Sequence, residues 1–404
     1  MAAPRILHLS TYDAHGGAAR AAFSIHKSLL DAGISSRMRV GSSSHKDPTI
    51  VENKKYPFML AKEADRRLWA LQNSDTATWR SPARFGSISA REINACRADV
   101  VHMHWVTDGF MSVETIGAIR KPIVWSLCDA WAFSGAEHYA TQVSRTRSQQ
   151  GYQKANRNPS DSGLDVDRWT WNRKKSNWQH PMQLLPASGW LTQATRDSAL
   201  MGTWPITQIP HIVDTNVFAP QPQRDKDTPV LLFLASAGIH DQRKGWDLLE
   251  QSLSDPALAT KIHVVVVGPK PTEIEQQKIK GNSRHQFTFH GEARGDQELI
   301  ELYAQADITV VPSREDNMPI TAMESQSCGT PVVAFRIGGL PDIVNPLTSG
   351  YLAEPENPHD LSQGIEQVLQ RDLRESTRTH ALATWSPEVV VPHLLNIYSQ
   401  ALAQ

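Results

Sequence analysis

The segment that decides the fold runs from Val311 to Val344, VPSREDNMPITAMESQSCGTPVVAFRIGGLPDIV. Residues 306–312 (ADITVVP) overlap the start of this segment. They form a β-branched run that ends at a proline, which predicts a buried parallel strand. A proline also opens the predicted helix over 319–327, where the first turn tolerates a missing N–H. A turn over 328–330 leads to a second predicted strand over 331–335. Strand, loop, helix and strand together form one βαβ unit of a parallel sheet.

Two acids lie eight positions apart around this helix start, Asp316 in the loop and Glu324 in the helix. The loop joins the carboxyl end of a strand to the amino end of a helix, where free backbone N–H groups and the helix dipole favour phosphate. The two acids could therefore reach two parts of one extended ligand. For two acids alone, a helix N-terminal acid and an exposed helix position would be the better explanation.

A cationic loop precedes this segment in the chain. The stretch AGIHDQRKG, residues 237–245, follows a strand predicted over 229–236 and contains Gly238 and the pair Arg243-Lys244. Two cations at the amino end of a helix oppose its dipole, which makes their position unfavourable. An anion bound between them would explain why both occur there. A solvated basic loop is the alternative.

Together with the proline, the C-G-T-P-V-V turn and Gly338-Gly339, the two acids resemble the donor-site motif E-x(7)-E of family-4 glycosyltransferases. The resemblance implies that Asp316 binds hexose hydroxyls and Glu324 the ribose of a nucleotide-sugar. The cationic loop resembles the family's R-x-x-K-G or R-K-G element, whose cations neutralise the donor diphosphate and stabilise the leaving group. The donor site implied in this chain comprises Gly238, Arg243, Lys244, Asp316, Asn317, Met318, Pro319, Ile320 and Glu324.

The amino-terminal half carries further motifs. Residues 6–33, ILHLSTYDAHGGAARAAFSIHKSLLDAG, predict a strand, a glycine loop and a helix, and resemble the signature of a subgroup that makes exopolysaccharides and includes colanic-acid-type transferases. Residues 124–135 resemble that subgroup's W-T-L-H-D-x-W-x-F-T-G motif, but Cys128 replaces the histidine that faces the donor sugar. Cysteine cannot reproduce an imidazole's hydrogen bonds or charge. The acceptor-side residues implied are Gly16, Gly17, Cys128, Asp129 and His138.

Strands and helices alternate along most of the chain, which predicts an α/β protein. A proline-rich crossing at 205–222 separates two such series, and the polar segment 141–181 is predicted to be a long loop or partly ordered insertion. This organisation matches the GT-B architecture, two Rossmann-like domains facing each other across a cleft. We expect an acceptor domain over 1–210, onto which a C-terminal helix at 387–404 packs back, and a donor domain over 211–386. The other strands are predicted over 5–10, 99–104, 122–127, 183–186, 261–268 and 286–290.

Composition limits the compartment and the cofactors. The 404 residues, 40% of them hydrophobic, suffice for two cores, and three cysteines without metal-ligand spacing give no sign of an oxidising compartment. We therefore expect a cytoplasmic protein, with no apolar run near the ~20 residues that cross a bilayer.

His102 and His104 would share one face of a strand, so a metal pair is geometrically possible. No third ligand is evident, and packing or capping is the alternative role for these histidines.

Charge is divided unevenly between the halves. Residues 1–217 contain 26 Lys and Arg against 18 Asp and Glu, whereas the rest contain 15 against 24. A basic first half suits an anionic membrane surface or a phosphate-bearing acceptor, although simple solvation explains it equally well. Peripheral contact with the inner face of the plasma membrane is therefore one expectation, and nucleic acid is not. Five tryptophans near Arg or Lys would suit a membrane interface or a core: Trp69, Trp79, Trp169, Trp171 and Trp178.

The resemblance implies a retaining hexosyltransferase that needs no metal or cofactor. In the implied front-face displacement, the catalytic residues are Arg243, Lys244, Asp316 and Asp129, and the acceptor is a saccharide, a lipid-linked saccharide or a small glycoside of surface polysaccharide or glycoconjugate synthesis. A GT-B epimerase or phosphorylase is a second interpretation, for which no lysine-cofactor or epimerase motif is seen. A catalytically weak or silent sugar-binding protein is a third, which Cys128 favours.

Overall fold

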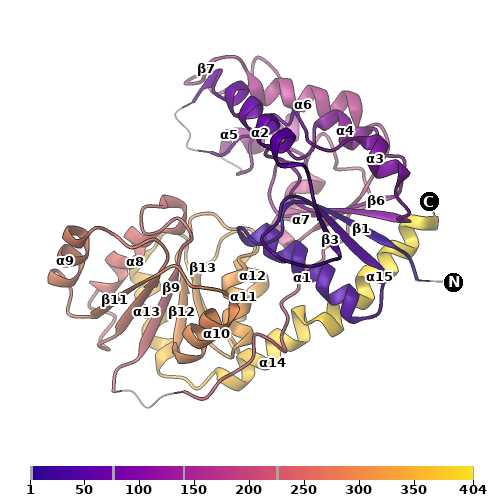
Figure 1. The fold of residues 1–404 in the computed structure, drawn as a ribbon. Coiled ribbons are helices and arrows are strands. Elements are labelled where there is room, and N and C mark those ends of the chain that lie inside the picture. The colour runs from indigo at the N-terminus through magenta and orange to yellow at the C-terminus, as the bar shows by residue number, and fades with distance from the viewer. Residues whose placement is uncertain (1–2, 75–77, 140–141, 224–226, 404) are drawn as a thin grey trace. The chain divides into compact units, whose positions relative to one another are not determined.

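The computed structural model describes residues 3–74, 78–139, 142–223 and 227–403, and the chain divides into two compact units (Figure 1). Unit 1 comprises Met1–Pro210 and Val391–Gln404, and unit 2 comprises His211–Val390. Each unit contains its own six-stranded parallel sheet with helices packed on it. None of the described helices is long and apolar enough to cross a membrane.

The sheet of unit 1 has the strand order β3-β2-β1-β5-β6-β8. In parallel register, Ile6 of β1 is paired with Ser36 of β2 on one side and Val100 of β5 on the other. Every residue of β5, β6 and β8 is buried, as is typical of parallel strands covered on both faces. The strands are β1 Ile6–Tyr12, β2 Ser36–Ser42, β3 Ile50–Glu52, β5 Val100–Met103, β6 Ile123–Leu127 and β8 Gln183–Pro186.

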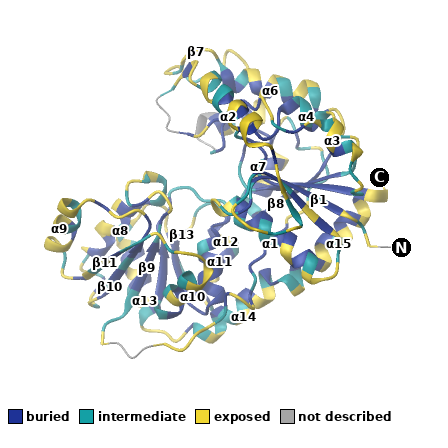
Figure 2. Cartoon of the chain, viewed as in Figure 1, coloured by how far each residue is buried: buried dark blue, intermediate teal, exposed yellow. Residues whose placement is uncertain are grey.

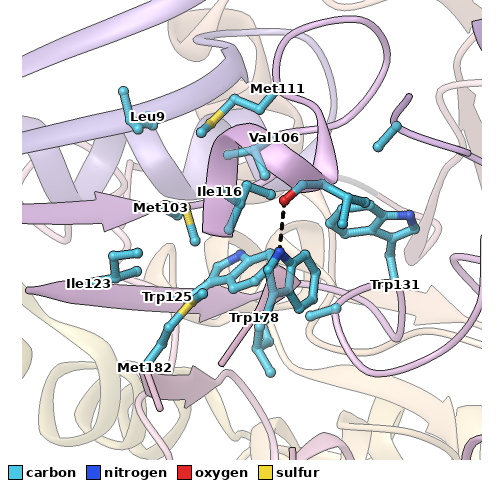
Figure 3. Packing of buried hydrophobic residues seen from close by; sticks show 14 of the residues in the cluster. Leu9, Met103, Val106, Met111, Ile116, Ile123, Trp125, Trp131, Trp178 and Met182 are labelled. Carbon is cyan, nitrogen blue, oxygen red and sulfur yellow. Dashed lines mark hydrogen bonds between the residues drawn. The ribbon is translucent and has the colours of Figure 1, made fainter. Parts of the chain in front are cut away.

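Three tryptophans form the centre of the core of unit 1. The ring centroids of Trp125, Trp131 and Trp178 lie 5.4–6.1 Å apart, and Trp178 Nε1 donates to the carbonyl of Val113 at 2.9 Å (Figure 3). Trp178 is 4% exposed and Trp171 6%, so these two belong to the interior and not to a membrane-facing surface. Of the two alternatives, the core therefore holds for Trp171 and Trp178, because cations nearby in sequence say nothing about which way a ring points.

The segment predicted as a long loop or partly ordered insertion contains two helices and a short strand, so the long loop is wrong and an insertion with ordered elements is what the structure has. Its elements are α5 Gln142–Gln150, β7 Ser162–Gly163 and α6 Val166–Asn177. Polar side chains hold it: the Asp165 carboxylate caps α6 and accepts from Arg147 at 2.7 Å. The buried ammonium of Lys174 donates to the backbone carbonyls of Trp131, Ser134 and Gly135. Because the anchoring groups are polar, apolar periodicity could not reveal these helices.

Seven further elements complete unit 1. The two-residue strand β4 Gln72–Asn73 pairs antiparallel with β7. Helix α15, Pro387–Ala403, begins in unit 2 and passes into unit 1 at Val391, four residues later than the predicted boundary at 387. The other helices of this unit are α1 Gly17–Asp31, α2 Lys55–Trp69, α3 Ala90–Ala95, α4 Val113–Gly117 and α7 Gly189–Arg196.

Unit 2 has the strand order β11-β10-β9-β12-β13-β14, again entirely parallel. Its strands are β9 Val230–Leu234, β10 His263–Val267, β11 Gln286–Gly291, β12 Ile308–Val311, β13 Val332–Phe335 and β14 Gly350–Ala353. Its helices are η1 Gln242–Lys244 (3₁₀), α8 Trp246–Leu253, α9 Glu273–Gly281, α10 Asp296–Gln305, α11 Ile320–Ser327, α12 Leu340–Ile343, α13 Pro358–Leu369 and α14 Arg374–Trp385.

Candidate functional site

The candidate donor site lies where the strand order of unit 2 reverses. From β9 the chain adds β10 and β11 on one side and β12, β13 and β14 on the other, so β9 and β12 are neighbours whose following loops diverge. Ligands of open parallel sheets bind at such a switch point, beyond the carboxyl ends of the strands. The loop after β9 contains the predicted cations, and the loop after β12 contains Asp316.

Two hydrogen bonds, both accepted by backbone carbonyls, tie these two loops together. The Arg314 N–H donates to the carbonyl of Arg243 at 2.8 Å, and the Arg243 guanidinium donates to the carbonyl of Glu315 at 3.2 Å. Gly245 has φ +70°, and a Cβ there would lie 1.9 Å from the Pro312 carbonyl oxygen. The glycine of the R-K-G element is therefore required for the loops to approach each other.

The structure brings the predicted cations and the first acid into contact. Lys244 Nζ lies 2.6 Å from Asp316 Oδ2, and Arg243 Nη1 lies 3.8 Å from the same oxygen. The Ser313 hydroxyl also donates to Oδ2, at 3.3 Å. All of these contacts use Oδ2, so within the described ranges Oδ1 is the oxygen that could accept a hydrogen bond from a ligand hydroxyl.

Electrostatics keep Asp316 ionised. Burial alone would raise the pKa of this carboxyl, but the charges of Lys244 and Arg243, with hydrogen bonds from Lys244 and Ser313, hold the pKa below its ordinary value. Arg243 Nη2 also lies 3.4 Å from Asp241 Oδ2, so two carboxylates face the two cations. The guanidinium of Arg243 and the ammonium of Lys244 are the groups here that can bind the oxygens of a diphosphate.

The double glycine packs against the same loop. The Gly339 N–H donates to the Asp316 carbonyl at 3.2 Å. Gly338 has φ +51°, and a Cβ there would lie 1.8 Å from the Asp316 carbonyl oxygen. Only glycine permits this close approach, so Gly338 helps to fix the backbone that presents the Asp316 side chain.

The remaining predicted donor residues lie at the start of α11 and in the loop after β9. Pro319 is the N-cap of α11, and Met318, Pro319 and Ile320 are buried, while Asn317 is half-buried. Gly238, at φ +78°, donates its N–H to the Ala235 carbonyl at 2.9 Å in the loop after β9.

Glu324 occupies a buried position on α11. Its side chain is 3% exposed, and Oε2 accepts a hydrogen bond from the hydroxyl of Tyr303 at 3.0 Å. An exposed helix acid is therefore excluded as the explanation of this residue. Sequence reasoning missed Tyr303, which lies on α10 and reaches Glu324 only through the packing of two helices.

In unit 1, the predicted glycine loop opens α1. Gly16 has φ +84°, and a Cβ on Gly16 or Gly17 would meet no atom within 4 Å. Sequence reasoning missed the residue that holds this loop: the buried carboxylate of Asp13 accepts from the Ser43 hydroxyl and the Ser44 N–H. The loop backbone at Gly16 and Gly17 is exposed.

Asp129 and His138, both predicted for the acceptor side, are in contact. His138 Nδ1 lies 2.6 Å from Asp129 Oδ2, and His138 Nε2 lies 2.8 Å from the hydroxyl of Ser81. Asp129 also accepts from the Trp105 indole N–H at 3.0 Å and the Trp131 backbone N–H at 2.9 Å. Both carboxylate oxygens therefore have protein donors, and Asp129 organises the loop after β6.

Cys128 lines a small pocket with Asp129, His104 and Trp105 at the carboxyl ends of β5 and β6. The thiol is partly buried, and burial, with a smaller contribution from the charge of Asp129, raises its pKa above the ordinary value. The thiol therefore stays protonated at neutral pH and is no nucleophile.

A buried histidine cluster lies on the sheet of unit 1. His8 on β1 is in register with His102 on β5, and it supplies the third imidazole that the sequence did not reveal. His8 Nδ1 lies 2.9 Å from His104 Nε2, while His102 lies 2.7 Å from the Tyr398 hydroxyl and 2.8 Å from that of Ser126. Burial lowers the pKa of His8 and His102 well below the ordinary value. A hydrogen bond between the imidazoles of His8 and His104, and two hydroxyl partners for His102, account for this geometry.

Most of unit 2 matches a known family model. Residues 214–382 match the family model "Glycosyl transferases group 1". D-inositol 3-phosphate glycosyltransferases are similar to parts of the chain. The protein from Saccharomonospora viridis is 32% identical over 186 residues, which cover 42% of this chain and 43% of the relative. The protein from Geodermatophilus obscurus is 36% identical over 194 residues, 44% and 41% of the two chains. The matches thus span less than half the length of these relatives.

Solved structures show the fold of the whole chain. A glycosyltransferase from Rickettsia africae superposes with a TM-score of 0.67 at 14% identity, covering 99% of both chains. Anabaena Alr3699/HepE, in complex with UDP and glucose, gives 0.62 at 14% identity, covering 98% of this chain and 100% of that one. The chain therefore has the GT-B fold, and residues 214–382 of its second unit are similar to the group 1 glycosyltransferases.

Proposed function

We propose that the protein is a retaining glycosyltransferase that moves a hexose from a nucleotide-diphosphate sugar to a hydroxyl acceptor. The observation that carries this proposal is the cluster of Arg243, Lys244 and Asp316 at the switch point of the group 1 domain. It places two cations, suited to the oxygens of a diphosphate, beside Asp316 Oδ1, which accepts no hydrogen bond from the described residues and is suited to a sugar hydroxyl.

Each donor residue has a proposed role. Arg243 and Lys244, with backbone N–H groups near residues 317–320, stabilise the departing nucleoside diphosphate. Asp316 Oδ1 accepts a hydroxyl of the hexose, while Glu324 accepts the ribose hydroxyls. The acceptor attacks from the face that the diphosphate leaves, so the anomeric configuration is retained and no covalent nucleophile, metal or cofactor takes part.

On the acceptor side, we propose that Gly16 and Gly17 offer backbone that can approach a ligand closely. Asp129 is proposed as a positioning residue, because its oxygens already accept three protein donors. His138 keeps Asp129 in place, and Cys128 lines the pocket together with Asp129.

The proposed acceptor is a saccharide, a lipid-linked saccharide or a small glycoside of exopolysaccharide or glycoconjugate synthesis, with cytoplasmic action at the inner face of the plasma membrane. The basic charge of unit 1 supports an anionic acceptor, and its similarity to D-inositol 3-phosphate glycosyltransferases adds an inositol phosphate to this class. A catalytically silent sugar-binding protein is the second candidate, favoured by Cys128 at the position where the resembling motif has histidine.

A panel of nucleotide-sugars tests the proposal. UDP-, GDP- and ADP-linked hexoses are each added to the protein, and its thermal unfolding is followed, since a ligand bound to the folded state raises the midpoint. One donor should raise the midpoint and then yield a glycoside with retained configuration when acceptors are supplied. Stabilisation without transfer to any acceptor would favour the silent protein, and no stabilisation by any donor would contradict both.

A further inference from the structure

Helix α2, Lys55–Trp69, has apolar side chains on two opposite faces. Phe58 and Ala61 point into unit 1 and are 3% and 7% exposed. On the other side, Tyr56, Met59 and Leu60 are 83%, 52% and 72% exposed, and α2 is largely yellow in Figure 2. Residues at i, i+3 and i+4 lie together on one face of a helix, so these three form one exposed apolar face.

An apolar helix face in water calls for an explanation, because a surface helix normally presents polar residues to solvent. Among the described residues, large exposed apolar side chains are concentrated in unit 1, and α2 contributes three on consecutive turns. More of them follow its end, where Leu71 is 50% exposed and Trp79 46%. The ring of Trp79 lies 5.7 Å from that of Trp69, the last residue of α2.

Cations flank this apolar face. Lys54 and Lys55 stand exposed at its start, and neither makes an ion pair within the part of the chain that the structure describes. At the other end, Arg66 and Arg67 both bind the single carboxylate of Glu63 at 2.8–2.9 Å, which leaves one positive charge in excess. Unit 1 as a whole contains 26 Lys and Arg against 17 Asp and Glu.

We propose that this face of α2, defined by Tyr56, Met59 and Leu60 with Lys54 and Lys55, docks the protein on an anionic lipid membrane. A helix that lies in the membrane interface needs an apolar face to enter the acyl boundary and cations to meet the headgroups. The charge of the surroundings selects a lipid surface over a second copy, since two such faces brought together would place cation against cation.

The proposal deepens the membrane contact proposed above, but it does not depend on the donor site. Vesicle binding needs neither nucleotide-sugar nor acceptor. A failure at α2 would therefore leave the glycosyltransferase proposal intact, and a failure of donor binding would leave the docking face intact.

Cosedimentation of the full chain with lipid vesicles tests the docking face. The protein should sediment with vesicles of equal parts phosphatidylglycerol and phosphatidylcholine and stay in solution with phosphatidylcholine alone. The triple variant Tyr56→Ser, Met59→Ser, Leu60→Ser should bind at least about tenfold more weakly, because the apolar contribution is lost. Lys54→Ala with Lys55→Ala should weaken binding about threefold to tenfold and reduce its dependence on salt.

A matched control uses two exposed apolar residues of unit 2. Ile274→Ser with Leu347→Ser, at positions 79% and 78% exposed, should bind vesicles like the unchanged protein. Circular dichroism confirms that each variant folds. Vesicle binding that survives the triple substitution, or no binding by the unchanged protein, would overturn the proposal. So would a concentration-dependent dimer that the triple variant abolishes, because the occupant would then be a second copy.

Discussion

At the scale of single residues, the candidate donor site shows how one carboxylate can serve two purposes. Asp316 binds Lys244 through Oδ2, while Oδ1, which accepts no hydrogen bond from the described residues, is the atom that we propose accepts a ligand hydroxyl. The sequence predicted the identity of these residues through motif spacing. It did not predict the ion pair between them, because the loops after β9 and β12 meet only when the sheet forms.

Glu324→Gln tests the proposed ribose contact. Glutamine keeps the shape and can still accept from Tyr303, but it loses the charge, so donor affinity should fall by about threefold to tenfold. Donor affinity is measured by calorimetric titration with the nucleotide-sugar that the thermal-unfolding panel identifies. Tyr303→Phe removes only the Tyr303 hydroxyl bond and is the control. Equal donor affinity in Glu324→Gln and the unchanged protein would refute the ribose role.

Cys128→His tests whether the thiol has replaced a useful imidazole. The pocket already contains Asp129 and His104, which could hydrogen-bond a second imidazole. We expect turnover with the identified donor to be kept or raised, measured against Cys96→Ser, a change at a cysteine outside the pocket. Complete loss of turnover in a folded variant would mean that the site is built around the thiol.

At the scale of elements, apolar periodicity predicted most strands of both sheets, because buried parallel strands are short continuous apolar runs. It failed for α5 and α6, whose anchors are the polar groups of Arg147, Asp165 and Lys174. It could not find the third histidine either, because His8 lies beside His102 only through the pairing of β1 with β5. Contacts distant in sequence are what a local pattern cannot show.

Gly338→Ala tests the coupling between two loops of unit 2. The new Cβ would collide with the Asp316 carbonyl at a positive φ, so the Asp316 loop must move. We expect the free energy of unfolding to fall by about 1–3 kcal/mol and donor affinity to fall at least about tenfold. Gly281→Ala, where a Cβ meets nothing within 4 Å, should change neither. Urea unfolding and calorimetry measure both, and full donor affinity in Gly338→Ala would contradict the coupling.

At the scale of the whole molecule, acid should weaken unit 1 through its buried histidines. Burial lowers the pKa of His26 from 6.5 to about 4, so at pH values between these two the unfolded state binds a proton that the folded state does not. The stability that neutral His26 provides is complete above pH 6.5 and is lost as the pH falls toward 4.

The comparison of His26→Gln with the unchanged protein isolates this group. The free energy of unfolding of the unchanged protein, taken relative to that of His26→Gln, should fall by up to about 1.4 kcal/mol per pH unit below pH 6.5. Hydrogen exchange of the β1 and β2 amides at pH 7 and pH 5 measures it, since His26 lies 2.7 Å from the Ser36 hydroxyl of β2. If the difference in free energy of unfolding between the two proteins stays constant from pH 7 to pH 5, His26 titrates normally in the folded protein.

The central claim concerns the cations of unit 2, and calorimetry of nucleoside diphosphate binding tests it most directly. In Arg243→Ala and in Lys244→Ala, affinity for the diphosphate of the identified donor should fall by about tenfold to a hundredfold, because each change removes a charged hydrogen bond to phosphate. Lys278→Ala, an exposed lysine on α9 of the same unit, should bind like the unchanged protein. Unchanged affinity in both Arg243→Ala and Lys244→Ala would contradict the account.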